Sequence, residues 1–133
     1  MVLLDTNIII KYIRQGLVVP DACFVSIVTI GEIKAFALKR NWGKQKLKIL
    51  QTNLVKLPVL DIDDKITDIY AEIDAFSQGL LLEKKLNDSA RNMGKNDLWI
   101  AATAYYFEIP LQTTDNDFDH LNDFGLKLDK VKF

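Results

Sequence analysis

The chain has 133 residues, of which 49% are hydrophobic and 26% are charged, a size and balance that predict one globular domain over residues 1–133. The formal net charge of −1 gives no overall positive charge of the kind that marks many nucleic-acid binders, and the single cysteine, Cys23, excludes an intramolecular disulfide and a cysteine-rich zinc site. The first residues lack the basic segment of a signal peptide and no apolar run reaches the length of a membrane span, so we expect a soluble cytoplasmic protein without a membrane partner.

Short apolar runs bounded by turn or polar residues are the first kind of element along the chain. Runs of this kind are typical of strands that are buried on both faces of a sheet. We expect strands at Val2–Leu4, Ala22–Val25, Leu57–Leu60 and Ile109–Gln112.

Helical spacing of apolar residues separates these runs. We expect a helix that carries Glu32, then helices over Leu47–Leu54, over Ile66–Phe76 behind Asp63 and Asp64, and over Asp97–Phe107. Residues 77–96 are predicted as helix followed by loop. Because strands alternate with helices, the sequence predicts a three-layer α/β/α fold with a central parallel sheet of four to five strands.

Acidic residues lie where the functional edge of such a sheet is expected. Asp5 ends the first strand, Glu32 lies on the helix after the second, Asp97 opens a helix, and Asp115 follows the last strand. The carboxyl ends of parallel strands share one edge, so these side chains should converge. Two carboxylates about 4 Å apart repel by roughly 4 kcal/mol at an effective dielectric near 20. Oxygen ligands without His or Cys suit Mg²⁺ or Mn²⁺, and such a site suits phosphoryl chemistry.

Each acidic residue also has a structural interpretation when taken singly. Glu32 follows Thr29 by three residues, which is the spacing of a capping box. Asp97 is also explained as a residue that answers the dipole of a helix start, and Asp115 as a turn residue. Asp5 is the hardest to explain in this way, because a charge at the end of a buried strand is costly unless it is paired.

Four motifs in order along the chain resemble the PIN-domain ribonucleases, and within them the VapC-type toxins of type II toxin–antitoxin pairs. The resemblance covers essentially the whole chain. Its motifs are Leu3-Leu4-Asp5-Thr6-Asn7, the segment from Ser26 to Glu32, Asn96-Asp97-Leu98-Trp99-Ile100-Ala101-Ala102-Thr103-Ala104, and Thr113-Thr114-Asp115-Asn116-Asp117-Phe118.

This resemblance implies specific roles for the residues in the motifs. It implies a quartet that holds one or two Mg²⁺ or Mn²⁺ ions, namely Asp5, Glu32, Asp97 and Asp115, with Asp117 as an additional acidic residue. It implies that the carboxylates are oriented by Thr6, Asn7, Thr113 and Thr114. The implied reaction is hydrolysis of single-stranded RNA, such as tRNA or rRNA loops, by metal-activated water with the 3′ oxygen leaving. The implied partners are a second copy of the chain and a small antitoxin whose C-terminal segment fills the groove.

Two other functions stay open at this point. One is a housekeeping RNA-processing nuclease of the same fold without an antitoxin, which the neighbouring reading frame would distinguish from a toxin. The other is a non-enzymatic signalling domain of the phosphoreceiver kind, which needs an adjacent acidic pair after the first strand and a lysine after the last. Thr6 and Asn7 follow Asp5 instead, and the predicted elements place no such lysine, so this function is disfavoured.

Basic residues are concentrated in one segment, because residues 33–60 contain seven basic and no acidic residues. Either these residues cover a solvated pair of helices, or they form a track for RNA phosphates. The candidate RNA contacts are Lys34, Lys39, Arg40, Lys44 and Lys46, together with Arg91 and Lys95 just ahead of Asp97.

Four other side chains carry expectations of their own. Trp42 is expected to anchor a corner between two helices, with stacking on an RNA base as the alternative. We expect Trp99 in the core or a dimer interface, Cys23 buried as a small apolar residue, and His120 at a solvated loop or helix position.

Overall fold

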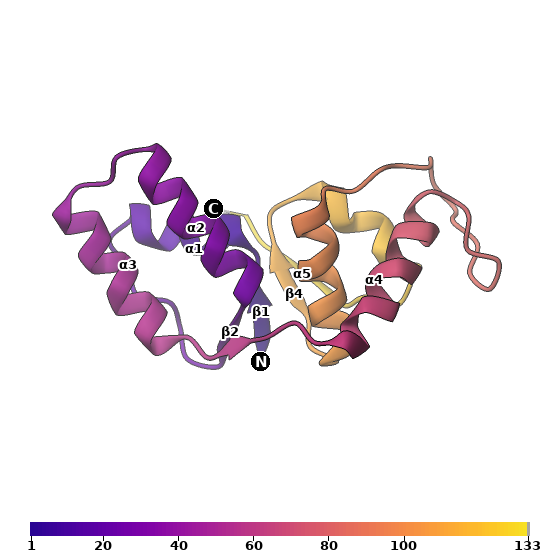
Figure 1. The fold of residues 1–133 in the computed structure, drawn as a ribbon, viewed down its shortest axis with the longest axis horizontal. Helices are drawn as coiled ribbons and strands as arrows, with labels where there is room; N and C mark the ends of the chain where they lie inside the picture. The colour runs from indigo at the N-terminus through magenta and orange to yellow at the C-terminus, as the bar shows by residue number, and fades with distance from the viewer. Residues whose placement is uncertain (133) are drawn as a thin grey trace.

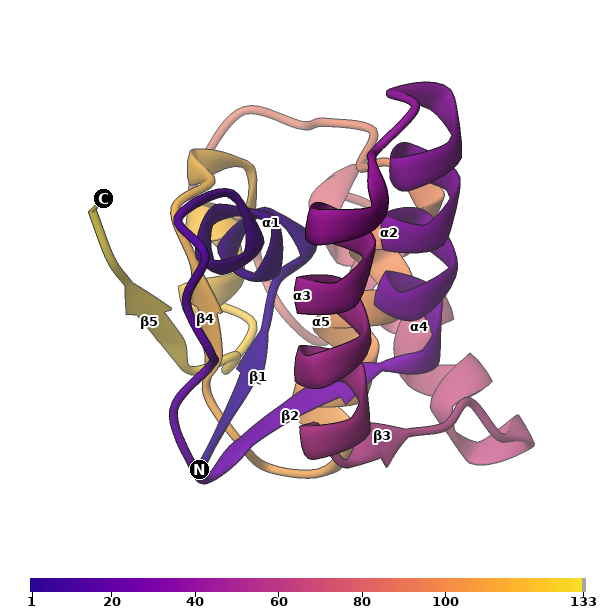
Figure 2. The ribbon, with the colours of Figure 1, turned by 90° about the vertical axis from the view of Figure 1, so that its left-hand side faces the viewer.

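One parallel sheet organises the chain in a computed structural model, which describes residues 1–132 (Figures 1 and 2). The strand order is β3-β2-β1-β4-β5, and every neighbouring pair is parallel. The strands are β1 (Val2–Leu4), β2 (Cys23–Ser26), β3 (Val59–Leu60), β4 (Leu111–Thr113) and β5 (Leu128–Lys130). The predicted parallel sheet is therefore confirmed, with five strands.

Helices cover both faces of this sheet, as Figure 1 shows. Neighbouring strand residues point to opposite faces, so Leu4 packs against α1, α2 and α3, whereas Leu3 packs against α4 and α5. Each of the two cores is continuous and apolar. The helices are α1 (Thr6–Arg14), α2 (Ile27–Lys39), α3 (Lys44–Lys56), α4 (Asp64–Ser77), α5 (Lys95–Tyr106) and the 3₁₀ helix η1 (Asn116–Asn122).

Polar side chains at the strand ends start the helices that follow them. Asp5 caps α1 directly after β1, and Ser26 caps α2 directly after β2. The predicted start of α4 is confirmed, because Asp63 accepts hydrogen bonds from the backbone N–H groups of Lys65 and Ile66. These strand-to-helix connections have almost no loop, so the first turns of α1 and α2 lie at the carboxyl edge of the sheet.

The structure corrects several predicted boundaries. The expected helix beyond Ser77 is absent over residues 78–94, because Gly79 takes a φ of 74° and the N–H of Leu80 turns back to the carbonyl of Ala75 at 2.8 Å. β3 is an edge strand with Val59 43% exposed, so it is not buried on both faces. The elements α1, η1 and β5 were not among those expected.

Within residues 1–132, no helix combines the length and the apolar character needed to cross a membrane.

Candidate metal centre

A cavity of about 740 Å³ opens at the carboxyl edge of the sheet, between the first turns of α1 and α5 and one side of α2. Its lining includes all four carboxylates of the predicted quartet, Asp5, Glu32, Asp97 and Asp115. We call it the acidic cavity. Four carboxylates that are spread over residues 5–115 of the sequence thus meet in one cavity, as the strand-end argument expected.

Asp5 is the most buried of these carboxylates, with 3% of its surface exposed. Its Oδ1 accepts from the backbone N–H of Thr6 at 2.8 Å, and its Oδ2 accepts from the hydroxyl of Thr113 at 2.7 Å. Burial raises the pKa of Asp5; the two hydrogen bonds oppose that rise, and the nearby charges of Asp115 and Glu32 add to it. The sequence expectation that this charge needs partners is met by two hydrogen-bond donors, and within residues 1–132 no cationic side chain forms an ion pair with Asp5.

Glu32 is held from the opposite wall of the cavity by α1. Its Oε1 accepts from the hydroxyl of Thr6 at 2.7 Å, and the same hydroxyl lies 3.1 Å from that of Thr29. The capping-box interpretation is wrong, because Ser26 caps α2 and Thr29 is a buried residue inside the helix. Glu32 therefore points into the acidic cavity instead of back to a helix start.

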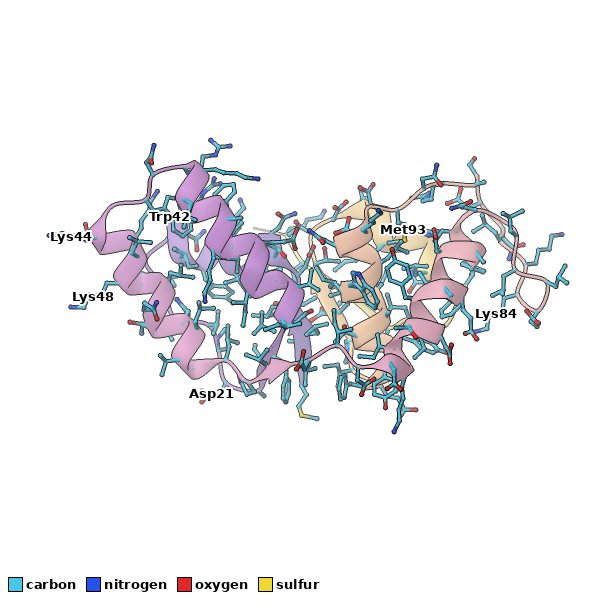
Figure 3. All side chains as sticks on the ribbon, in the orientation of Figure 1. Asp21, Trp42, Lys44, Lys48, Lys84 and Met93 are labelled. Carbon is cyan, nitrogen blue, oxygen red and sulfur yellow. The ribbon has the colours of Figure 1, made fainter. Side chains whose placement is uncertain are left out.

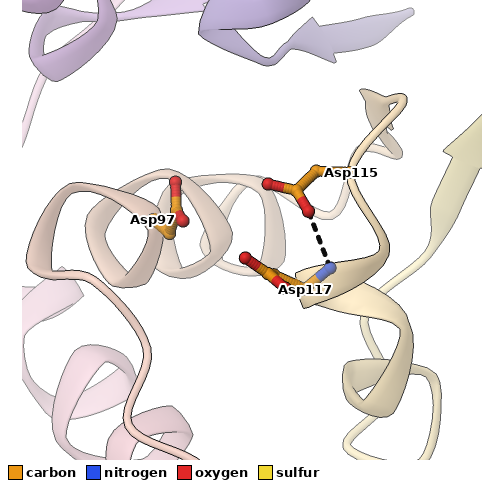
Figure 4. A group of neighbouring side chains, drawn as sticks. All are labelled: Asp97, Asp115 and Asp117. Carbon is orange, nitrogen blue, oxygen red and sulfur yellow. Dashed lines mark hydrogen bonds between the residues drawn. The ribbon is translucent and has the colours of Figure 1, made fainter.

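Three carboxylates form the tightest cluster (Figure 4). Asp97, from the first turn of α5, and Asp115 and Asp117, from the start of η1, each place one carboxylate oxygen within 4.8 Å of the other two. Asp115 also accepts from the backbone N–H of Asp117 at 2.9 Å through Oδ1, which leaves its Oδ2 free of that bond. Asp117, which the sequence placed in an assisting role, thus belongs to the same 4.8 Å cluster as Asp97 and Asp115.

Electrostatic repulsion in this cluster appears in Asp97. Burial raises its pKa to about 6, and the negative charges of Asp5, Asp115, Glu32 and Asp117 contribute to that rise. Asp97 also lies in the first turn of α5, whose N-cap Gly94 makes no side-chain hydrogen bond, so its charge is compatible with the helix dipole as well. A divalent cation would relieve the repulsion, and carboxylate oxygens are its preferred ligands. The residues present therefore fit a hard cation.

The four residues predicted to orient the carboxylates behave differently from one another. Thr6 and Thr113 each donate a hydroxyl hydrogen bond to a quartet carboxylate, as described above. Asn7 is exposed and lines the acidic cavity. Thr114 is half-buried, and within residues 1–132 its side chain donates no hydrogen bond to a carboxylate.

The candidate RNA contacts are spread over several surfaces. Lys39 lines the acidic cavity, and Lys95 borders a smaller pocket beside Glu32 and Asp97. Arg91 pairs with Asp88 at 3.1 Å. The remaining candidates line neither of these pockets: Lys34 lies within α2, Arg40 follows its end, and Lys44, labelled in Figure 3, and Lys46 lie in the first turn of α3.

The two tryptophans lie in different places, one at a helix corner and one beside the acidic cavity. Trp42 is buried at the corner between α2 and α3. Its ring lies edge-on to that of Phe36, with 5.8 Å between the ring centroids, so the predicted anchor is confirmed. Trp99 packs against Tyr70, with 4.2 Å between the ring centroids, and also lines the acidic cavity.

Two residues outside the motifs differ from expectation. His120 is buried, 4% exposed, and shares a 2.7 Å hydrogen bond with Ser77, so the solvated position was wrong. Lys130 ends β5 and so lies at the carboxyl edge of the sheet, where the sequence had placed no lysine. Its amino group donates to Asn116 and Asp119.

Cys23 is buried as expected, and burial raises the pKa of its thiol.

The parallel sheet in the order 3-2-1-4-5 defines an α/β domain of the doubly wound class. Its functional site is the cavity at the carboxyl edge, where carboxylates from the ends of β1 and β4 meet those of α2 and α5. The PIN domain family matches residues 2–123. The chain belongs to the PIN-domain family, which confirms the resemblance found in the sequence.

Individual relatives narrow the comparison. The chain is 31% identical over 101 residues to Ribonuclease VapC4 of Mycobacterium tuberculosis, a match that covers 74% of this chain and 71% of the relative. Among solved structures, VapBC2 from Rickettsia felis bound to a promoter DNA fragment matches with a TM-score of 0.74, 23% identity, and coverage of 99% of this chain and 100% of the other. VapBC-5 from M. tuberculosis, a member of the VapBC family of toxin–antitoxin systems, matches with a TM-score of 0.66, 25% identity, and coverage of 98% and 97%.

Proposed function

We propose that this protein is a divalent-metal-dependent endoribonuclease that cleaves single-stranded RNA, and that it acts as the toxin of a toxin–antitoxin pair. The observation that carries the nuclease proposal is the acidic cavity, in which carboxylates from four separate elements converge; in the described part of the chain, residues 1–132, none of the four forms an ion pair. The relative named Ribonuclease VapC4 supports RNA as the substrate. Loops of tRNA or rRNA are the proposed targets.

The proposed cation is Mg²⁺ or Mn²⁺, with one or two ions held by Asp5, Glu32, Asp97 and Asp115 and assisted by Asp117. When bound, such a cation supplies Lewis-acid activation of water and stabilises charge on the phosphate during hydrolysis. The protein's own contribution is to hold the carboxylates in fixed directions. Thr113 does so for Asp5, and Thr6 does so for Glu32.

The surroundings of the carboxylates give the RNA two kinds of contact. Lys39 and Lys95 line two pockets that both include Glu32, and they offer positive charge to backbone phosphates. Trp99 and Ile62 form an apolar part of the same cavity, against which an unpaired base can pack. An unpaired base is needed for this contact, which favours single-stranded RNA over a duplex.

A cleavage assay with matched aspartate variants tests the nuclease proposal. Asp5→Asn and Asp97→Asn should each abolish Mg²⁺- or Mn²⁺-dependent cleavage of a single-stranded RNA pool while circular dichroism shows an intact fold. Asp68→Asn is the control, because it removes the same charge from an exposed position of α4 outside the acidic cavity. Full activity of either cavity variant, or cleavage by the wild type that persists in excess EDTA, contradicts the proposal.

The toxin role has separate support and needs a separate test. VapBC-5, 25% identical to this chain, belongs to a family of toxin–antitoxin systems. We therefore expect the chain to arrest growth when expressed alone, to form a homodimer, and to be silenced by the small protein encoded beside it. Growth arrest should disappear with Asp97→Asn and on co-expression with that neighbour. Cleavage activity without growth arrest, together with no inhibition by the neighbour, indicates a housekeeping RNA-processing nuclease instead.

A further inference from the structure

We infer that Lys130, at the end of the last strand, is a positioning residue that fixes the direction of the Asp117 carboxylate in the metal centre. The inference rests on the proposed function, because it takes the acidic cluster to bind a divalent cation. It goes beyond that function by giving a role to a residue outside all four motifs. The observation is a pair of hydrogen bonds that connects β5 to the short helix that carries Asp117.

The geometry of this connection is specific. Lys130 is in register with Thr113 across the β4–β5 pair, so its side chain starts beside the strand end that leads into η1. Its amino group donates to Oδ1 of Asn116 at 2.6 Å and to Oδ1 of Asp119 at 2.8 Å. These two acceptors flank Asp117 in the sequence.

The symmetry of a 3₁₀ helix explains why a contact with residues 116 and 119 fixes residue 117. With three residues per turn, side chains three apart lie in one row, so η1 has three rows. The core row, Phe118 and Leu121, is fully buried, and the row held by Lys130 is Asn116 and Asp119. The third row is Asp117, which faces Asp97 and Asp115 (Figure 4), followed by His120, which is buried and hydrogen-bonded to Ser77. Together with the core row and His120, Lys130 therefore fixes the rotation of η1 about its axis, and with it the direction of Asp117 at the exposed start of the helix.

Short 3₁₀ helices depend on such outside contacts, because their internal hydrogen bonds have poor geometry. At its start, η1 is held by the cap that Asp115 provides to the N–H of Asp117. Asp115 and Asp117 are both proposed metal ligands, so a hydrogen bond between them does not fix the direction of either one relative to the sheet. Lys130 supplies an anchor from a strand of the sheet.

Charge and position predict opposite effects when the amino group of Lys130 is removed. Loss of a positive charge near an acidic cluster makes the local potential more negative and so strengthens cation binding. Loss of a positioning contact weakens cation binding, and contacts that orient metal ligands typically change affinity by about 10- to 100-fold. The sign of the change therefore separates the two roles.

Calorimetric titration with Mn²⁺ measures this sign without an activity assay. We expect Lys130→Met to bind Mn²⁺ about tenfold more weakly than the wild type, and Lys130→Arg to restore most of the affinity because it keeps a charged donor. Lys127→Met is the matched control, because it removes the same charge from an exposed lysine that lines a pocket away from the carboxylates. Its affinity should equal or exceed that of the wild type.

A neutral variant keeps the test valid if Lys130→Met is poorly folded. Asn116→Ala removes one acceptor of the Lys130 amino group without a change in charge, and it should also weaken Mn²⁺ binding. Binding by Lys130→Met or by a folded Asn116→Ala that is equal to or tighter than wild type overturns the inference. Absence of Mn²⁺ binding by the wild-type protein instead overturns the proposed metal centre, and the inference with it.

Discussion

Thr113 and Asp5, 108 residues apart in the sequence, are joined by a hydrogen bond of 2.7 Å from the threonine hydroxyl to Oδ2 of the aspartate. The same hydroxyl oxygen accepts from the backbone N–H of Asp115 at 2.9 Å. Since Thr113 ends β4 and Asp5 follows β1, its neighbour in the sheet, one buried hydroxyl sets the relative position of two proposed metal ligands. A strand of the sheet therefore carries the hydroxyl group that donates to Asp5.

Replacing this hydroxyl should affect both stability and activity. Thr113→Val keeps the shape of the side chain but leaves the buried Oδ2 of Asp5 without its donor, which typically costs about 1–3 kcal/mol in the free energy of unfolding. Because the ligand direction is no longer fixed, we expect metal-dependent RNA cleavage to fall by about 10- to 100-fold. Urea unfolding and single-turnover cleavage measure the two effects.

Thr113→Ser is the matched control for that substitution, since it keeps the hydroxyl. It should retain cleavage within a few-fold of wild type, with a modest loss of stability from the missing methyl group. Wild-type cleavage by Thr113→Val at low Mn²⁺ concentration contradicts a role for the hydroxyl in ligand orientation.

The ionised carboxylate of Asp97 should lower the free energy of unfolding of the metal-free protein at neutral pH. Its pKa is raised from 3.8 to about 6, so between these values the folded state binds more protons than the unfolded state, and stability falls as pH rises from about 4 to 6. A shift of about two pKa units corresponds to roughly 3 kcal/mol, which solvent screening at this half-exposed carboxyl reduces to about 1 kcal/mol. We expect Asp97→Asn to be more stable than wild type by this amount at pH 7.5 in EDTA.

The pH dependence identifies the cause of that gain. The advantage of Asp97→Asn over wild type in urea unfolding should shrink as pH falls from 6 towards 4, because the wild-type carboxyl then becomes protonated. Asp68→Asn, which changes an exposed carboxylate in α4, should show no comparable advantage at any pH. An Asp97→Asn variant that is less stable than wild type at pH 7.5 would show that Asp97 has a structural role instead.

Much of this site could be predicted from the sequence because parallel sheets bring strand ends together. Asp5 and Asp115 follow apolar runs directly, so their convergence needed only the strand assignments and the rule that such ends share an edge. The choice between cap and ligand for Glu32 could not be made in this way. It depends on where α2 begins, and Ser26 and Thr29 are both good caps.

Other features could not be predicted because their signal is in tertiary contacts. β5 is three residues long, and two of them are charged, Leu128-Asp129-Lys130, so it lacks the apolar pattern of a buried strand. It forms as an edge strand by pairing with β4. The burial of His120 depends on a hydrogen bond to Ser77, 43 residues away. No local pattern in the sequence encodes either contact.

Divalent cations should stabilise the folded protein markedly. A ligand that binds only the folded state adds about 2.7 kcal/mol at 100 times its Kd, which for a domain of this size raises Tm by about 10 °C. We expect this shift in thermal melts with Mn²⁺ relative to EDTA. NaCl of equal ionic strength should not reproduce it, and Asp97→Asn should lose most of it. A Tm that does not change with Mn²⁺ contradicts the metal centre.

Ser77 and His120 provide a structural test outside the metal centre. Their 2.7 Å hydrogen bond connects the end of α4 to η1 and is buried, and burial, followed by the charge of Arg91, lowers the pKa of His120. Ser77→Ala leaves Nε2 of the imidazole without this partner, so the free energy of unfolding should fall by about 1–3 kcal/mol. Exposed Ser89→Ala is the control and should leave stability unchanged. Because neither Ser77 nor His120 lines the acidic cavity, cleavage at saturating Mn²⁺ and at a temperature well below Tm should stay within about twofold of wild type. Loss of cleavage by a folded Ser77→Ala protein would instead place this pair in the functional site.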